Sequence, residues 1–287
     1  MTIQQVLDGA MLKLMPVTAE ARGEAERLLA MVLNQSRSYL RAWPEKNLTR
    51  EEISDFEEWV RRRSLGEPMA YLQGVKEFWS LPFQVTPDTL IPRPETEVLV
   101  EQVLAIFPDP HPVVKLADLG TGCGAVAIAL AHERPAWAVC AVDVSESALC
   151  IARKNARQLA INSISFYLGN WCTALPCHGF DVIVSNPPYV SELEWEQYAR
   201  GLAFEPIGAL VSGSDGLNAI REIASEAQNY LKSGGYLLME HGFSQGPAVR
   251  ALLKAAHYQR IRTVCDLAGR ERVTVGRSSV IVRRAVP

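Results

Sequence analysis

The sequence lacks any run of about 18 uninterrupted apolar residues, the length that a membrane-spanning helix needs. Residues 1–10 also lack a basic stretch followed by an apolar one, which is the pattern of a secretory signal. These two absences predict that the 287-residue chain acts in the cytoplasm and has no membrane partner.

Cysteine is present, but not in a pattern that binds metal or builds a disulfide framework. No C-x-x-C pair occurs, and no spacing of His and Cys suggests a zinc site. We therefore expect no metal, and scattered cysteines in apolar runs are typical of a reducing compartment. The six are Cys123, Cys140, Cys150, Cys172, Cys177 and Cys265.

Basic charge is not in excess either. The chain has 29 Lys and Arg residues against 32 Asp and Glu, a formal net charge of −3. Proteins that bind duplex nucleic acid rely on basic charge, so we expect no nucleic-acid partner. The only compact basic cluster is Arg61-Arg62-Arg63, and Glu57 and Glu58 precede it by about one helical turn. That pattern is typical of a solvated helix face.

The chain divides near residue 85 into a helical part and an alternating part. Before this point apolar residues recur at threes and fours, which predicts helices over residues 6–14, 19–33, 36–42 and 50–66. Thr49 followed by Glu52 matches a capping box at the start of the last of these. Residues 69–85 mix glycine, proline and aromatic residues, which indicates an extended connector or a hairpin.

After residue 85, strand-like and helix-like runs alternate, which predicts a mostly parallel sheet with helices on both faces. The last two strand candidates are separated by a short turn at Gly269, so we expect them to pair as an antiparallel hairpin. The strand candidates are residues 113–119, 137–142, 164–168, 182–185, 236–240, 260–267 and 272–275.

The segment Asn186-Pro187-Pro188-Tyr189 follows an apolar run, residues 181–185, that predicts a buried strand. The carboxyl end of such a strand faces the ligand crevice of an open α/β sheet. Two prolines stiffen the turn and remove backbone donors, while Asn186 adds a side-chain acceptor. This acceptor-rich clamp suits a planar NH2 group, and the Tyr189 ring offers a face for stacking. The alternative is a plain strand-to-loop turn, since Asn-Pro often ends a strand.

A glycine-rich turn with Gly120, Gly122 and Gly124 lies between the strand candidate 113–119 and a helix-like run. Strand, glycine-rich turn and helix form a nucleotide crevice, although G-x-G-x-G differs from the dinucleotide spacing. Asp143 follows the next strand candidate, where a carboxylate can accept both hydroxyls of a ribose. Asp143 can also be an acid at a helix N-terminus, but its pairing with the glycine turn favours the ribose role.

These motifs resemble those of class I S-adenosylmethionine-dependent methyltransferases, among which N-P-P-Y marks enzymes that methylate a planar nitrogen. Four further stretches are similar to the bacterial release-factor glutamine methyltransferases, the HemK family. They are residues 77–81, 90–97, 204–206 and 271–274. The resemblance extends from the N-terminal helices to about Gly276.

The resemblance implies an α/β fold of the class I methyltransferase type. This is a Rossmann-like, mostly parallel seven-stranded sheet with an antiparallel C-terminal hairpin, preceded by a small N-terminal helical-bundle domain. The implied domains are a helical substrate-docking domain over residues 1–70, a connector or hairpin over 71–95, and a methyltransferase domain over 96–287. The chain is expected to be a monomer.

The resemblance also implies a reaction. The substrate is the glutamine of the Gly-Gly-Gln motif in class-one peptide chain release factors, methylated at N5, and S-adenosylmethionine becomes S-adenosylhomocysteine. The implied catalytic residues are Asn186, Pro187 and Tyr189, and the substrate is held by the whole Asn186-Pro187-Pro188-Tyr189 segment. The implied cofactor-binding residues are Gly120, Thr121, Gly122, Cys123, Gly124, Asp143, Asn170, Trp171 and Asn186.

The chain departs from the family at two places. Asn170 stands where relatives usually carry an acid before the Trp, and its side-chain carbonyl can still accept from an adenine amino group. Gly201 and Ala203 replace an Asp and an Arg of some relatives.

Other functions remain open from the sequence. A near relative methylates a glutamine of a ribosomal protein, but residues 92–97 resemble the release-factor type. Adenine N6-methylation through the same clamp requires base flipping and a basic groove, which the net charge does not support. A catalytically silent S-adenosylmethionine-binding module is a third possibility, and the intact clamp argues against it.

Overall fold

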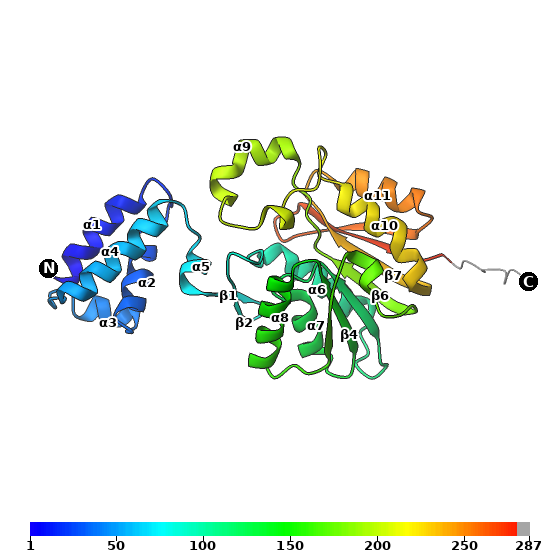
Figure 1. Cartoon of the computed structure of the whole chain (residues 1–287), viewed down its shortest axis with the longest axis horizontal. Helices are drawn as coiled ribbons and strands as arrows, with labels where there is room; N and C mark the ends of the chain where they lie inside the picture. The colour runs from blue at the N-terminus through cyan, green and yellow to red at the C-terminus, as the bar shows by residue number, and fades with distance from the viewer. Residues whose placement is uncertain (280–287) are drawn as a thin grey trace, which may run out of the picture. The chain divides into compact units, whose positions relative to one another are not determined.

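The computed structural model describes residues 1–279, without the side chains of residues 198–202. Gly201 and residues 280–287 therefore lie outside the described side chains. The chain separates into two compact units, Met1–Gly74 and Val75–Pro287 (Figure 1). Each unit has a hydrophobic core of its own.

The first unit is a small helical bundle. Its helices are α1 (Ile3–Leu14), α2 (Ala21–Val32), α3 (Arg37–Ala42), α4 (Arg50–Ser64) and α5 (Met69–Gln73). Helices α1, α2 and α4 contact one another in pairs and bury apolar side chains such as Leu7, Leu28 and Phe56. The predicted capping box at Thr49 and Glu52 is present, with both reciprocal hydrogen bonds. The predicted helical-bundle part is thus confirmed.

The second unit is built on a seven-stranded sheet of order β5-β4-β3-β6-β7-β9-β8. Neighbouring strands from β5 to β7 run parallel, and β9 is antiparallel to both β7 and β8. The predicted fold class and the antiparallel C-terminal hairpin are confirmed. The strands are β3 (Lys115–Leu119), β4 (Ala138–Asp143), β5 (Ile164–Leu168), β6 (Phe180–Ser185), β7 (Leu231–Glu240), β8 (Gln259–Cys265) and β9 (Glu271–Arg277).

Helices cover this sheet in two groups. The first group is α6 (Glu97–Ile106), α7 (Ala125–Glu133) and α8 (Glu146–Gln158), and the second is α10 (Asn218–Tyr230) and α11 (Gly246–Ala255) (Figure 1). Strand residues alternate between the two faces, so Ala117 and Leu119 share a core cluster with Ile220 and Ile223 of α10. A further helix, α9 (Glu192–Leu202), follows β6. None of the described helices has the length and apolar character needed to span a membrane.

The region predicted as an extended connector or a hairpin contains a hairpin and also a short helix. Helix α5 ends at Gly74, which has a left-handed φ of 68°. Strands β1 (Val75–Phe78) and β2 (Leu81–Gln84) then pair as an antiparallel hairpin. The backbone N–H of Gln84 donates to Oδ1 of Asn155 on α8 at 2.7 Å, so the hairpin is attached to α8 within the second unit.

The strand order reverses direction at β3. After β3, the chain adds β4 and β5 on one side of this strand and then crosses to add β6 and β7 on its other side. In open α/β sheets, ligands bind beyond the carboxyl ends of the strands at such a switch point. The fold therefore directs attention to the loops that follow β3, β4, β5 and β6.

Candidate active site

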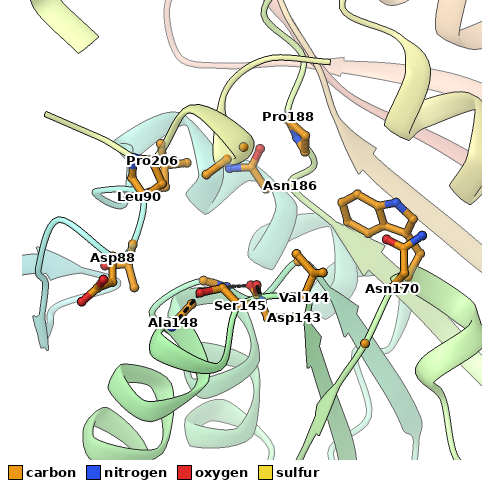
Figure 2. A pocket seen from close by; sticks show the side chains of 17 residues that line it. Asp88, Leu90, Asp143, Val144, Ser145, Ala148, Asn170, Asn186, Pro188 and Pro206 are labelled. Carbon is orange, nitrogen blue, oxygen red and sulfur yellow. Dashed lines mark hydrogen bonds between the residues drawn. The ribbon is translucent and has the colours of Figure 1, made fainter. Parts of the chain in front are cut away.

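Residues that end or follow these four strands line one cavity of about 840 Å³, including its open mouth (Figure 2). Gly120 and Gly122 follow β3, Asp143 ends β4, Trp171 follows β5 and Asn186 follows β6. Figure 2 shows Asp143 and Asn186 on opposite sides of the cavity.

The glycine-rich turn presents its backbone to the cavity. Gly120, Gly122 and Gly124 have φ angles of 72°, 57° and 86°, in the left-handed region that residues with a Cβ disfavour. At Gly120 the lack of a side chain also makes room, since a Cβ there would lie 3.0 Å from Cζ3 of Trp171. The turn thus brings bare backbone and an aromatic ring together at the cavity wall.

Asp118, near the end of β3, fixes the glycine turn from inside the protein. Its Oδ2 accepts hydrogen bonds from the Thr121 hydroxyl at 2.6 Å and from the Ala127 N–H at 3.2 Å. Burial raises the pKa of Asp118 to about 6, although these hydrogen bonds oppose the shift. This role of Asp118 could not be predicted from the sequence, because the partners of a buried acid are brought to it only by the fold.

Three residues of the turn that were predicted to bind the cofactor do not line the cavity, namely Thr121, Cys123 and Gly124. The Thr121 hydroxyl donates to Asp118. Burial raises the pKa of the Cys123 thiol to about 12. The Cys123 carbonyl accepts from the side chain of Asn155 at 2.9 Å. A Cβ on Gly124 would lie 2.8 Å from Cδ1 of Ile128, so this glycine permits close packing at the start of α7. These residues shape the turn, and any contact with a cofactor stays a prediction.

Asp143 holds two loops with its carboxylate. Its Oδ2 accepts from the Gly122 N–H at 2.7 Å and its Oδ1 accepts from the Ser145 N–H at 2.9 Å. Ser145, and not Asp143, is the N-cap of α8, since its side chain accepts from the Ala148 N–H. Burial raises the pKa of Asp143, and the backbone hydrogen bonds act against this shift. Each carboxylate oxygen retains a lone pair for a further donor.

Asn170 and Trp171 border the cavity after β5. Trp171 begins the 3-10 helix η2 (Trp171–Ala174) and has a positive φ of 38°. The side-chain amide nitrogen of Asn170 donates to Glu222 on α10 at 2.7 Å. The side-chain carbonyl oxygen of Asn170 is left as an acceptor. A flat ring and a nearby acceptor are the features that recognise an adenine.

Asn186 carries a buried acceptor without a partner. Its Nδ2 donates to Oγ1 of Thr96 at 3.2 Å, whereas its Oδ1 is buried and has no hydrogen-bond partner among the described residues. Leaving a buried polar atom unpaired costs about 1–3 kcal/mol, and native proteins rarely do so without reason. Pro187 is buried beside it and Pro188 lines the cavity. The geometry is that of an acceptor kept for a bound donor.

Tyr189 lies toward the sheet. Its hydroxyl donates to Oε1 of Glu240, the last residue of β7, at 3.3 Å. Burial raises the pKa of the Tyr189 phenol above its ordinary value, so it stays protonated. Its carbonyl accepts from the Gln245 side chain at 2.9 Å. Tyr189 is not among the cavity-lining residues, and its predicted stacking on a substrate stays a prediction.

A second buried acid joins the segments that form another part of the wall. Glu205 accepts from the Ile91 N–H at 3.1 Å and forms an ion pair with Arg93. It thereby connects the segment containing Leu90 to the one containing Pro206, both of which line the cavity (Figure 2). Both stretches carry the family resemblance in the sequence, but no local pattern predicts this contact between them.

Comparisons with known proteins agree with this architecture. A family model described as the PrmC N-terminal domain matches residues 5–74, and the methyltransferase small domain matches residues 95–202. A release factor glutamine methyltransferase from Coxiella burnetii is 46% identical over 277 residues, covering 96% of this chain and 99% of that protein. The chain belongs to the release factor glutamine methyltransferase family.

A second member of the family, from Escherichia coli K12, is 45% identical over 256 residues, or 89% of this chain and 92% of that protein. A methyltransferase structure from Pyrococcus furiosus shares the fold at 16% identity, with a TM-score of 0.51 over 77% of this chain and 98% of that one. The resemblance inferred from the motifs is confirmed. The chain is a methyltransferase, and its family and fold imply a methyl donor.

Proposed function

We propose that this chain transfers a methyl group from S-adenosylmethionine to the amide nitrogen N5 of the glutamine in the Gly-Gly-Gln motif of release factors. The observation that carries the proposal is the buried Oδ1 of Asn186, which no described residue partners, in the cavity that Gly120 and Asp143 also line. A primary amide offers the N–H donor that this acceptor lacks. The names of the relatives support a release factor as the protein partner, and the proposed location is the cytoplasm.

The cavity residues fit S-adenosylmethionine. The backbone of Gly120 and Gly122 permits close approach of a ligand. The Asp143 carboxylate has lone pairs left for ribose hydroxyls, and Trp171 and Asn170 supply a face and an acceptor for adenine. These observations support the assignment of S-adenosylmethionine as the cofactor.

S-adenosylmethionine supplies an electrophilic methyl group on a sulfonium sulfur. The receiving amide nitrogen is a poor nucleophile, because its lone pair is delocalised into the carbonyl. Oδ1 of Asn186 and the backbone oxygen of Pro187 can accept the two NH2 hydrogens and so orient the nitrogen. The same acceptors stabilise the positive charge that grows on the nitrogen during transfer. Asn186 has no useful basicity, so the surplus proton passes to solvent after transfer.

Asp143→Ala is expected to weaken S-adenosylmethionine binding by on the order of 1–3 kcal/mol, because the ribose loses its acceptors and Gly122 loses its partner. Isothermal titration calorimetry on the folded variant measures this loss. Asp215→Ala is a matched control, since Asp215 also accepts from a backbone N–H two residues further on, at Leu217, but lies outside the cavity wall. Equal affinities for Asp143→Ala and the unaltered protein would contradict the ribose assignment.

Mass spectrometry tests the proposed reaction directly. A release factor, a set of ribosomal proteins and duplex DNA are each incubated with the protein and S-adenosylmethionine. The expected result is one added methyl group, on the glutamine of the Gly-Gly-Gln peptide. Methylation of a ribosomal protein or of adenine with no change to the release factor would show that the proposal is wrong.

We also propose that the first unit binds the release factor and takes no part in the chemistry. The proposed docking domain comprises residues 1–70, the connector or hairpin residues 71–95, and the methyltransferase domain residues 96–287. In support, every residue that lines the cavity belongs to the second unit. The first unit has its own hydrophobic core, so it does not depend on cavity residues to fold.

A further inference from the structure

Asn186 is held by residues outside its own segment. Its Nδ2 donates to Oγ1 of Thr96, which is 3% exposed. The Thr96 hydroxyl in turn lies near the carboxylate of Glu240, which is 1% exposed, and lowers its pKa. Glu240 in turn accepts from the Tyr189 hydroxyl at 3.3 Å. The contacts form a buried chain from Asn186 through Thr96 to Glu240, and from there to Tyr189.

Thr96 lies where the 3-10 turn η1 (Pro94–Thr96) continues into α6, and its own φ and ψ angles are helical. Its hydroxyl makes no capping hydrogen bond with the helix backbone. It accepts from the Asn186 side chain instead, so Thr96 contacts the clamp from a distant part of the chain.

We propose that Thr96 and Glu240 are positioning residues that fix the direction of the Asn186 side-chain amide. This inference rests on the proposed function, because the direction matters only if Oδ1 receives the substrate amide. An ionised carboxylate can only accept hydrogen bonds, so Thr96 donates to Glu240 and its oxygen then accepts from Asn186. The amide nitrogen of Asn186 consequently faces Thr96, and its oxygen is left for the cavity.

Protonation of Glu240 removes this preference. A neutral carboxyl group can donate a hydrogen bond to Thr96, which then has its own hydroxyl hydrogen free for Asn186. Asn186 can then turn its oxygen toward Thr96 and its NH2 group toward the cavity. Two NH2 groups would meet there, and the substrate amide would have no side-chain acceptor.

The balance of charges places this change near neutrality. Burial raises the pKa of Glu240 to about 7, and the charge of Glu95 adds to the rise. Hydrogen bonds from Thr96 and Tyr189 and the positive charge of Arg272 oppose it. The ionised form that orders the clamp is therefore present above about pH 7 and is lost as the pH falls below it.

Two substitutions at Thr96 test the chain of contacts. Thr96→Val keeps the shape and removes the hydroxyl, so turnover should fall by about ten- to a hundredfold through misorientation of the clamp. The variant should stay folded and keep its affinity for S-adenosylmethionine, although its melting temperature should fall because Nδ2 of Asn186 loses its partner. Thr96→Ser restores the hydroxyl and should recover most of the turnover.

Glu240→Gln tests the charge. The variant cannot ionise, so its turnover should be reduced at pH 8 and should lack the decline below about pH 7 expected of the unaltered protein. Glu226→Gln is the matched control: burial raises the pKa of Glu226 too, but Glu226 does not line the cavity. This control should keep the full pH profile.

Several results would overturn the inference. They are normal turnover in Thr96→Val, no recovery in Thr96→Ser, an unchanged acid decline in Glu240→Gln, or loss of cofactor binding in parallel with turnover. The result for the unaltered protein distinguishes a failure of the positioning roles from a failure of the proposed function. If it methylates the release factor while the variants match it, only the positioning roles fail. If it methylates no release factor, the proposed function itself is wrong.

Discussion

Replacing Asn186 by alanine is expected to lower the turnover of methyl transfer by roughly a hundredfold or more, because a pre-organised acceptor at the reacting nitrogen is lost. The substitution removes Oδ1, which has no hydrogen-bond partner in the described part of the chain, and a single hydrogen bond from Nδ2 to Thr96. The fold should therefore survive. Most cofactor affinity should survive too, since the glycine turn, Asp143 and Trp171 are untouched.

Single-turnover methylation of a release factor, with the variant saturated in S-adenosylmethionine, isolates the chemical step from binding. Asn162→Ala serves as the matched control, because Asn162 is exposed and lies outside the cavity wall. That variant should react at the normal rate. A near-normal rate for Asn186→Ala, or a loss explained entirely by weaker cofactor binding, would rule out the clamp mechanism.

The sheet could be predicted from the sequence because its central parallel strands β3, β4 and β6 are largely buried on both faces and appear as continuous apolar runs. Strand β5 has the predicted bounds, and β3, β4 and β6 differ by a residue or two. Strand β7 begins at Leu231, earlier than the predicted residue 236. Gly234 and Gly235 have low strand propensity, and only pairing along β6 and β9, with a register shift near Phe180, keeps this stretch in the sheet.

Helix α5 was missed for a different reason. At five residues, Met69–Gln73 is too short to show helical periodicity, and Pro68 and Gly74 on either side indicate a loop. The left-handed φ of Gly74 ends the helix and the β1–β2 hairpin starts at the next residue. Composition alone describes such a region only as connector or hairpin.

The candidate site was predictable to the extent that it follows from strand ends. Gly120, Asp143 and Asn186 were expected at one edge of the sheet, and all three line one cavity. Their binding and catalytic roles stay predictions. Thr96 and Glu240 could not be found this way, because they contact Asn186 and Tyr189 across 90 and 51 residues of sequence. Such contacts depend on how helix α6 and strand β7 meet, which no local pattern describes.

A chain that starts at Val75 is expected to bind S-adenosylmethionine normally but to methylate a release factor on the order of 10²–10⁴ times less efficiently, because the tether is lost. Val75 is the right first residue, since the first unit ends at Gly74 and the β1–β2 hairpin packs on α8 through Gln84 and Asn155. The cavity, its glycine turn and the Asn186 clamp all remain in the shortened chain.

A short peptide containing Gly-Gly-Gln supplies the decisive comparison. It carries the reacting glutamine but offers the first unit little to bind, so the full and shortened chains should methylate it at similar rates. Loss of activity toward the release factor alone assigns the first unit to docking, whereas equal loss toward both substrates assigns it a part in the chemistry. Full efficiency toward the release factor without residues 1–74 would refute the docking role. Calorimetry of S-adenosylmethionine binding on the same sample shows that any loss reflects the missing helices and not an unfolded second unit.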